Sequence, residues 1–369
     1  MKVAFLTTTM FSRTNGPSNF AVNLYDLANY NKYSIDFQFI TEDAKNELGI
    51  IYVPTKWSSI FSDVGMIIKS IEYYKAIKGV EFDLKVWNFS LIGWYSIYKN
   101  RNNTKNVVFV NDLLSLDCRF NFSYSYIRYK IFRFFESFSC KRADCVITNS
   151  EVLKRKIIEN YKVKEHKVKV LYKGINIPKL EQAKNNWSIK TNDNIKISFV
   201  KTNYVEGGFE MLCEALSKLN HLKFEILVVG PSKIDKVKTD YKNIAIKCLG
   251  RLNKEELYNA ISKTDLYCVP CLNEAFGQAN IEALALQIPT IILPTDIQVN
   301  LHSKEYCWFP KECNNISLSD EILELVNATE LERKEKALRA RQIMETKYSI
   351  ESTSVIFNKF LQNTVNGSF

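Results

Sequence analysis

The sequence contains little histidine and no long hydrophobic run. Only 3 of its 369 residues are His, which leaves few nitrogen ligands for a metal site. No apolar stretch approaches the roughly 20 residues that a membrane-spanning helix needs. Residues 1–6, followed by three threonines, have too short an apolar core for a signal peptide. We therefore expect an intracellular, cytoplasmic protein.

Cysteine is present, but it does not indicate a disulfide framework. The 9 cysteines are scattered through a long chain, and their number is odd. Cys268 and Cys271 form the one pair with the spacing of a metal or redox motif. A zinc site would need two more ligands nearby, and only His166, His221 and His302 are available. We interpret the pair as two small apolar residues at a strand end, and we predict no metal site.

The composition is that of a globular protein with an excess of positive charge. Apolar residues make up 46% and charged residues 24%, which excludes a disordered chain. At roughly 150 residues per domain, the length predicts two domains. The balance of 50 Lys+Arg against 40 Asp+Glu gives a net charge of +10. This charge suits an anionic partner, whether nucleic acid, a membrane surface or a phosphorylated small molecule.

Short β-branched runs alternate with segments of helical periodicity along the chain. The runs are almost continuously apolar at their centres, as in strands that are covered on both faces. This alternation predicts βαβ units and mostly parallel sheets. A polar break over residues 178–194 predicts an interdomain linker. The expected strands are 3–8, 35–41, 49–54, 84–89, 106–111, 145–149 and 169–174 before the break, and 195–200, 224–230, 244–250, 266–270 and 290–294 after it.

The two halves predict two doubly wound α/β domains. We expect the first over residues 1–177 and the second over 195–345, with a cleft where the two face each other. Ligands of such sheets bind at the carboxyl ends of the strands. The C-terminal residues 346–369 are expected to form a helix that crosses back to the first domain.

The most informative segment follows the strand expected at 266–270. Glu274 lies in a loop, Gly277 gives the backbone freedom at a turn, and Glu282 lies about 12 Å further along if the stretch is helical. A helix start presents unpaired N–H groups and a positive dipole end, which favours phosphate. Two acceptor carboxylates suit sugar hydroxyls. A solvated loop glutamate and an ordinary helix glutamate have the same spacing, so the spacing alone leaves both interpretations open.

This segment resembles the E-x7-E region of retaining glycosyltransferases of family 4. Seven residues separate Glu274 from Glu282 within the pattern P-x-x-x-E-x-x-G-x-x-x-x-E-A-x-A. The resemblance extends over residues 143–154, 170–176 and 250–270 in the right order, so it covers most of the chain. It implies the GT-B fold, in which two Rossmann-like doubly wound domains face each other across a cleft and helices end the chain.

The resemblance also implies roles for individual residues. It places Glu274 at the hydroxyls of the donor sugar, as a catalytic residue, and Glu282 at the ribose of the donor nucleotide. The N–H groups near Gly277, Gln278 and Ala279 would meet the diphosphate. No cofactor is implied beyond the nucleotide-diphosphate sugar itself. Since the chain contains no Asp-x-Asp pair, we expect an enzyme that needs no metal.

Two cationic positions of the family are replaced in the second half. After the first strand of that domain the family has Gly-Arg and, five residues beyond the Arg, Lys-Gly. Here Thr202 stands at the Arg position and Gly207 at the Lys position. Each donor to such a leaving group is typically worth a few kcal/mol. We assign Lys201 and Thr202 to the donor site, with Lys201 supplying one charge; a plain surface lysine is the alternative.

The first half departs from the family as well. Asn111 stands where the family often carries a His beside the donor sugar. Asn still hydrogen-bonds a hydroxyl or an oxyanion, so we keep Asn111 as a catalytic candidate. The first βα turn retains one glycine, Gly16, of a glycine-rich loop, and we predict ligand contact there. The alternative is that Ser18 or Asn19 simply caps a helix.

The segment 124–142 is basic and rich in aromatic residues. Its cations include Arg128, Lys130 and Arg133, against the single acid Glu136. A helix of this kind can lie on an anionic membrane. The alternative is a helix that packs its aromatics on the sheet and shows its basic residues to water. RNA binding is disfavoured because no recognisable nucleic-acid module is present.

Together these features predict a retaining, metal-independent glycosyltransferase of cell-surface polysaccharide synthesis, such as lipopolysaccharide assembly. It would move a sugar from a nucleotide-diphosphate donor to a glycan or lipid-linked acceptor. The alternative is a non-catalytic GT-B protein that partners an active transferase, which the replaced cations and histidine motivate. A nicotinamide-dependent dehydrogenase is disfavoured, because it needs Gly-x-Gly-x-x-Gly after the first strand.

Overall fold

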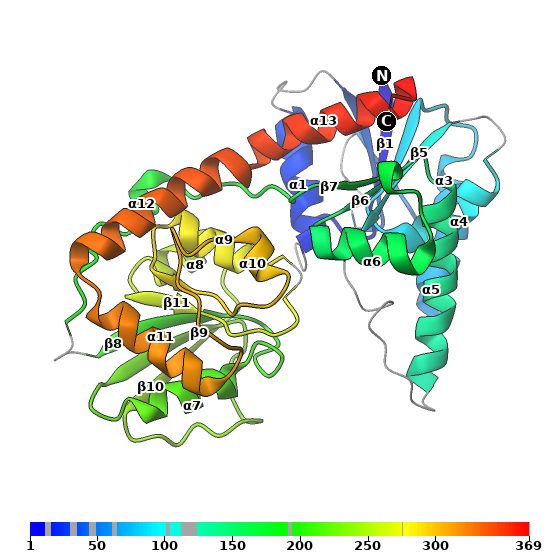
Figure 1. Cartoon of the computed structure of the whole chain (residues 1–369). Coiled ribbons are helices and arrows are strands. Elements are labelled where there is room, and N and C mark those ends of the chain that lie inside the picture. Colours follow the sequence, from blue (N-terminus) through cyan, green and yellow to red (C-terminus); the bar gives the residue numbers. More distant parts are fainter. Residues whose placement is uncertain are drawn as a thin grey trace. The chain divides into compact units, whose positions relative to one another are not determined.

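The computed structural model describes residues 1–11, 16–29, 35–43, 49–60, 65–100, 104–111, 124–190, 194–274 and 276–368. The chain divides into two compact units. Unit 1 comprises Met1–Ile175 together with Ile350–Phe369, and unit 2 comprises Asn176–Ser349. Both termini of the chain therefore belong to unit 1 (Figure 1).

Unit 1 is built on a seven-stranded sheet in the order β3-β2-β1-β4-β5-β6-β7. Every pair of neighbours is parallel, as the alternating pattern of the sequence predicts. The order changes direction between β1 and β4, so this is a doubly wound sheet. The strands are β1 (Lys2–Leu6), β2 (Asp36–Thr41), β3 (Ile50–Tyr52), β4 (Leu84–Trp87), β5 (Lys105–Val110), β6 (Cys145–Thr148) and β7 (Val168–Val170).

Helices complete unit 1, including the last helix of the chain. Phe357 of α13 is fully buried, and its ring centroid lies 5.8 Å from those of Phe20 and Phe109. The C-terminal helix therefore supplies part of the core of this unit. The helices are α1 (Gly16–Asn29), α2 (Lys56–Ile60), α3 (Gly65–Ile77), α4 (Ser90–Tyr98), α5 (Tyr124–Arg142), α6 (Glu151–Tyr161), the 3-10 turn η1 (Glu165–Lys167) and α13 (Ile350–Asn366).

Unit 2 repeats the design with a five-stranded parallel sheet in the order β10-β9-β8-β11-β12. Its order changes direction between β8 and β11. The strands are β8 (Ile195–Val200), β9 (Phe224–Val229), β10 (Ile244–Gly250), β11 (Leu266–Cys268) and β12 (Thr290–Ile291). The helices are η2 (Leu180–Gln182), α7 (Phe209–Lys218), α8 (Lys254–Ile261), α9 (Gln278–Ala285), α10 (Gln298–Leu301), α11 (Asn315–Asn327) and α12 (Glu330–Lys347).

The segment expected to be a linker packs onto unit 2. Trp187 is buried and its indole N–H donates to the Gln287 carbonyl at 3.1 Å. Lys184 Nζ lies 3.3 Å from Asp265 Oδ1, and the Arg333 Nε–H donates to the Trp187 carbonyl at 2.7 Å. Its polar residues thus make specific buried contacts, which a search for apolar periodicity does not detect.

Besides its bond to Trp187, Arg333 donates hydrogen bonds to backbone carbonyls at the C-terminal end of α11. Its Nη1 donates to the carbonyls of Leu325 and Val326 at 3.1 and 3.2 Å. We expect Arg333→Ala to lower the free energy of unfolding by about 2–4 kcal/mol, because several buried carbonyls lose their donor. Arg339→Ala is the control: Arg339 is exposed in the same helix, and its loss should cost no more than about 0.5 kcal/mol. Urea unfolding that gave both variants the same stability would contradict this account.

Candidate functional site

The residues singled out in the second half lie at the switch point of the unit 2 sheet. The strand order changes direction between β8 and β11. The loops that follow these two strands cover residues 201–208 and 269–277, and they lead into α7 and α9. In doubly wound sheets, ligands bind in the crevice at this point, outside the carboxyl ends of the strands.

Lys201 and Glu274 meet across this switch point. Lys201 Nζ lies 2.6 Å from Glu274 Oε2, and both side chains are largely shielded from solvent. The other carboxylate oxygen accepts the Gly277 N–H at 3.2 Å. Burial by itself lowers the pKa of Lys201, but Glu274, with smaller effects from Cys271 and Glu206, raises it above its usual value. Lys201 is therefore a fixed cation held beside the start of α9.

The loop before α9 is shaped by a glycine and an amide network. Gly277 has a φ of +75° and is the N-cap of α9, and it supplies no side-chain cap. Gln298 of α10 donates to the Glu274 carbonyl at 3.3 Å and accepts from Asn280 Nδ2 at 3.3 Å. The first turn, with Gln278 and Ala279, thus begins without a capping side chain over the positive end of the helix dipole.

Glu282 lies one turn further into α9 and is paired with a residue that sequence reasoning missed. Its side chain is only 3% exposed and forms an ion pair with Lys254, whose side chain is 39% exposed. Burial raises the pKa of Glu282, and Lys254 opposes that rise. Lys254 is the first residue of α8, after Asn253, which caps that helix at the end of β10. The sequence could have indicated Lys254, because it follows β10 at the carboxyl edge of the sheet, where Glu282 also lies.

The structure gives a physical reason for the replaced lysine position. A Cβ on Gly207 would lie 2.8 Å from the Phe199 ring and 2.9 Å from Lys201 Cγ. The stem of Lys201 therefore occupies space that a side chain at position 207 would need. Thr202, at the replaced arginine position, is exposed to solvent. Lys201 is the lysine of this loop that reaches the start of α9, through its ion pair with Glu274.

The loop after β8 is fixed at both ends. The Tyr204 hydroxyl donates to Asp235 Oδ1 at 2.9 Å and accepts the Lys236 N–H at 3.1 Å. Gly208, with φ of +76°, approaches the neighbouring loop so closely that an added Cβ would lie 2.1 Å from the Pro270 carbonyl oxygen. The position of Lys201 relative to Glu274 thus depends on a tight contact between two loop backbones.

Unit 1 has a polar network at the switch point of its own sheet. Asn88, directly after β4, is fully buried. Its Nδ2 donates to Thr7 Oγ1 at 3.1 Å and to the Pro17 carbonyl at 3.0 Å, and its Oδ1 accepts from Lys173 Nζ at 3.2 Å. The side chain ties the ends of β1 and β4 to the start of α1. Sequence reasoning did not identify Asn88 or Lys173.

Asn111 follows the next strand and has one unused acceptor. Its Nδ2 donates to the Asn88 carbonyl at 2.5 Å, and its own carbonyl accepts from Asn149 Nδ2 at 2.8 Å. Its Oδ1 is buried without a hydrogen-bond partner among the described residues. Asn111 also lines a cavity of about 240 Å³ together with Arg128 and Glu136. An acceptor in that position can accept a hydrogen bond from a hydroxyl group of a ligand.

The first βα turn is described only in part. Gly16 is the first residue of α1 and is exposed. Ser18 is buried and its hydroxyl lies 2.5 Å from Thr9 Oγ1. Residues 12–15, which complete the turn expected to contact a ligand, lie outside the described residues.

Cys268 and Cys271 are free thiols, and burial raises the pKa of each. Within the described ranges, no three His, Cys, Asp or Glu side chains gather as metal ligands would. None of the helices in those ranges combines the length and the apolar character required to cross a membrane.

Models of known protein families match both units. The model for glycosyl transferases group 1 matches residues 181–341, and the model for glycosyltransferase family 4 matches residues 39–178. Together these matches cover most of the chain. The protein belongs to the family 4 type of glycosyltransferases, which confirms the resemblance drawn from the E-x7-E segment.

Individual proteins are similar to parts or all of the chain. A 41.2 kDa protein in the cps region of Klebsiella pneumoniae is 25% identical over 167 residues, which cover 44% of this chain and 46% of that protein. The chain thus spans less than half of the length of this curated relative.

Solved structures resemble the whole chain at low sequence identity. Sucrose-phosphate synthase of Thermosynechococcus elongatus has a TM-score of 0.73 and 13% identity over 100% of both chains. Anabaena HepE in complex with UDP has a TM-score of 0.70 and 14% identity, over 98% of this chain and 100% of its own. The lipopolysaccharide outer core galactosyltransferase WaaB has a TM-score of 0.69 and 12% identity over 100% of both. These similarities confirm the predicted GT-B fold class.

Proposed function

We propose that the protein is a retaining glycosyltransferase that uses a nucleotide-diphosphate sugar and a glycan or lipid-linked acceptor. The observation that carries this proposal is the arrangement of Lys201, Glu274 and Gly277 at the start of α9, on the switch point of unit 2. A cation, an uncapped helix start and a carboxylate are the groups that a diphosphate joined to a sugar requires. UDP is bound by the structurally similar HepE.

The proposed reaction exchanges one bond at the anomeric carbon. The bond to the diphosphate oxygen breaks, and the acceptor hydroxyl oxygen forms its bond on the same face. Because the acceptor oxygen and no enzyme group forms the new bond, no covalent enzyme intermediate arises. The acceptor proton passes to the departing phosphate oxygen. Glu274 contacts the donor sugar hydroxyls, and Glu282 faces the nucleotide ribose. Asn111 of unit 1 stays a catalytic candidate, because its unused acceptor can take a hydrogen bond from a sugar hydroxyl.

Two lysines supply the positive charge that the reaction needs. Negative charge develops on the diphosphate as it departs, and preorganised cations stabilise it. Lys201 takes the place of the family's Arg and Lys in the loop after β8. Lys254, paired with Glu282 and partly exposed, is the second candidate for this task. No metal is needed in this account, because the two ammonium groups already stand at the sheet edge.

Lys201→Ala is expected to weaken binding of the nucleotide-diphosphate sugar about tenfold to a hundredfold, since one charge-assisted contact is lost. Titration calorimetry in EDTA measures the affinity. Lys218→Ala is the control, because Lys218 is an exposed residue in the last turn of α7 and should bind the donor as the wild type does. Equal donor affinity in the wild type and Lys201→Ala would remove Lys201 from the site.

The face of α5 that is turned to solvent supports a peripheral membrane contact. Ile127, Lys130, Ile131 and Phe134 are all exposed, and they follow each other at helical spacing on one face. The Arg133 guanidinium also lies near the surface, bonded to Asn160 Oδ1 at 2.9 Å. Apolar and basic side chains in such a stripe favour an anionic lipid surface. We assign the face to contact with the membrane that carries the acceptor.

Ile127→Gln combined with Phe134→Gln is expected to reduce cosedimentation with vesicles of phosphatidylcholine and phosphatidylglycerol. The matched control is Val355→Gln with Ile356→Gln, which removes two exposed apolar residues from α13. Vesicles of phosphatidylcholine alone should retain little of either variant or of the wild type. Equal sedimentation of the two double variants would return α5 to a structural role.

A further inference from the structure

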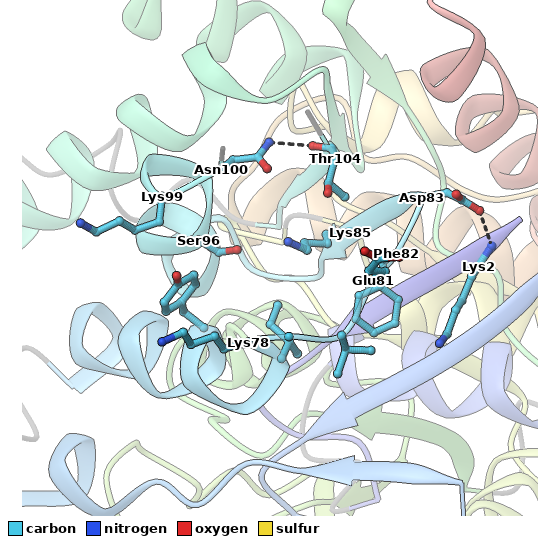
Figure 2. Close-up of a pocket in the computed structure, with 14 residues that line it drawn as sticks. Lys2, Lys78, Glu81, Phe82, Asp83, Lys85, Ser96, Lys99, Asn100 and Thr104 are labelled. Carbon is cyan, nitrogen blue, oxygen red and sulfur yellow. Dashed lines mark hydrogen bonds between the residues drawn. The ribbon is translucent and has the colours of Figure 1, made fainter. Parts of the chain in front are cut away.

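Unit 1 contains a basic pocket at the opposite edge of its sheet from Asn88 and Asn111. The pocket has a volume of about 730 Å³. Figure 2 shows Lys85 at its centre, with Lys78 and Lys99 on one side and Lys2 on the other. No role in the proposed transfer falls on any of these lysines.

The fold brings these lysines together from separate elements. Lys2 begins β1, and Lys85 is the second residue of β4. Lys78 directly follows α3, and Lys99 is the C-cap of α4. A helix C-terminus attracts a cation through its dipole, which accounts for Lys78 and Lys99 in part. Nothing of this kind explains a lysine in the central strand β4.

The pocket has more positive charge than its own residues balance. Its lining includes two carboxylates, Glu81 and Asp83, and Asp83 accepts the backbone N–H of Lys2 at 2.8 Å. Within the described part of the chain, none of the four ammonium groups forms a hydrogen bond or an ion pair. Two of them lie over aromatic rings instead: Lys2 Nζ is 5.3 Å from the centre of the Phe82 ring, and Lys99 Nζ is 5.3 Å from that of Tyr98.

Lys85 lies in this pocket without a partner for its charge among the described residues. Its side chain is half-buried, and burial lowers the pKa of its ammonium group with no carboxylate to offset the effect. Placing like charges around one partly enclosed space weakens the folded state, unless an anion enters that space. The arrangement is thus suited to a ligand that brings several negative charges.

We propose that this pocket binds a small molecule that carries two or more closely spaced phosphate groups and an organic part. The four lysines supply the charge, as point cations that phosphate groups commonly engage. Tyr74, Ile77, Val80 and Phe82 supply an apolar wall, and the volume falls in the usual range of ligand pockets. Since the pocket lies at the amino ends of β1 and β4, its ligand is an effector and not a substrate of the carboxyl edge.

Pyrophosphate is the probe that tests this site. Because the proposed donor site would also take pyrophosphate, the titrations are made in the full chain carrying Lys201→Ala. In that background Lys85→Gln with Lys99→Gln should weaken pyrophosphate binding at least about tenfold. The matched control is Lys141→Gln with Lys164→Gln, which removes the same charge from two exposed positions of unit 1 and should change the affinity by no more than about twofold.

Two further measurements distinguish a soluble phosphorylated ligand from a lipid phosphate. ADP should bind more tightly than pyrophosphate if the apolar wall holds an organic part of a soluble ligand. Sedimentation with phosphatidic acid vesicles should be equal for the two double variants if the ligand is soluble; a selective loss in the pocket variant would instead identify a lipid phosphate in the same site. Equal pyrophosphate affinity and equal sedimentation for both double variants would overturn the proposal. A failure of donor binding elsewhere in the chain would leave these results unchanged.

Discussion

Glu274→Gln is expected to lower kcat/KM for sugar transfer by about 10²- to 10³-fold. The amide retains the shape of the side chain and still accepts the Gly277 N–H, but it no longer carries the charge that holds Lys201 at 2.6 Å. The cation would then be free to leave the start of α9, and the contact to the donor sugar would lose its ionised acceptor. Release of nucleotide diphosphate in the presence of acceptor measures the rate.

Glu210→Gln provides the control for this loss. Glu210 is exposed in the first turn of α7, and its neutralisation should change kcat/KM by no more than about twofold. Circular dichroism and the unfolding midpoint should be the same for both variants and the wild type. Transfer by Glu274→Gln at the rate of the Glu210→Gln control would show that Glu274 plays no part in the reaction.

Gly208→Ala is expected to destabilise unit 2 by about 3–5 kcal/mol, with loss of donor binding. Two effects add at this position. A non-glycine residue is strained at the φ of +76°, and the new Cβ would stand 2.1 Å from the Pro270 carbonyl oxygen. The loops after β8 and β11 would have to separate, which moves Lys201 away from Glu274.

Gly250→Ala separates these two effects. Gly250 has a similar φ of +68°, but an added Cβ there meets no atom within 4 Å. Its replacement should therefore cost only about 1 kcal/mol, the strain alone. Urea unfolding measures both variants. Equal destabilisation by the two alanines would mean that the contact between the loops does not hold the site.

The fold was predictable because the central strands of its sheets are buried on both faces. Each of the twelve runs proposed from the sequence overlaps a strand, and β8 and β10 have the predicted limits. Elsewhere the apolar run extends beyond the strand, as at Val269 and Pro270 after β11, because loop residues at the carboxyl edge are buried too. Apolar residues in the sequence mark buried positions, and these continue past the last residue that is hydrogen-bonded to a neighbouring strand.

The sequence indicated most of the candidate site where one segment carries it. Glu274, Gly277 and Glu282 lie in a single strand–loop–helix unit, and the family resemblance, not their spacing, singled them out. Lys201 was proposed from its place beside the replaced arginine position. The lack of room for a side chain at Gly207, beside the stem of Lys201 and the Phe199 ring, appears only in the folded loop. The pairing of Glu282 with Lys254 joins two helices that are distant in sequence.

The central claim is that the carboxyl edge of the unit 2 sheet binds a nucleotide-diphosphate sugar. A thermal-shift screen of such donors in EDTA, on the wild type and Glu282→Gln, tests it most directly. A ligand that binds the native state raises Tm. We predict that donors of one nucleotide raise the Tm of the wild type by about 2–5 °C at saturating concentration, and that the shift is largely lost in Glu282→Gln. An unchanged Tm with every donor, or an equal shift in both proteins, would contradict the account.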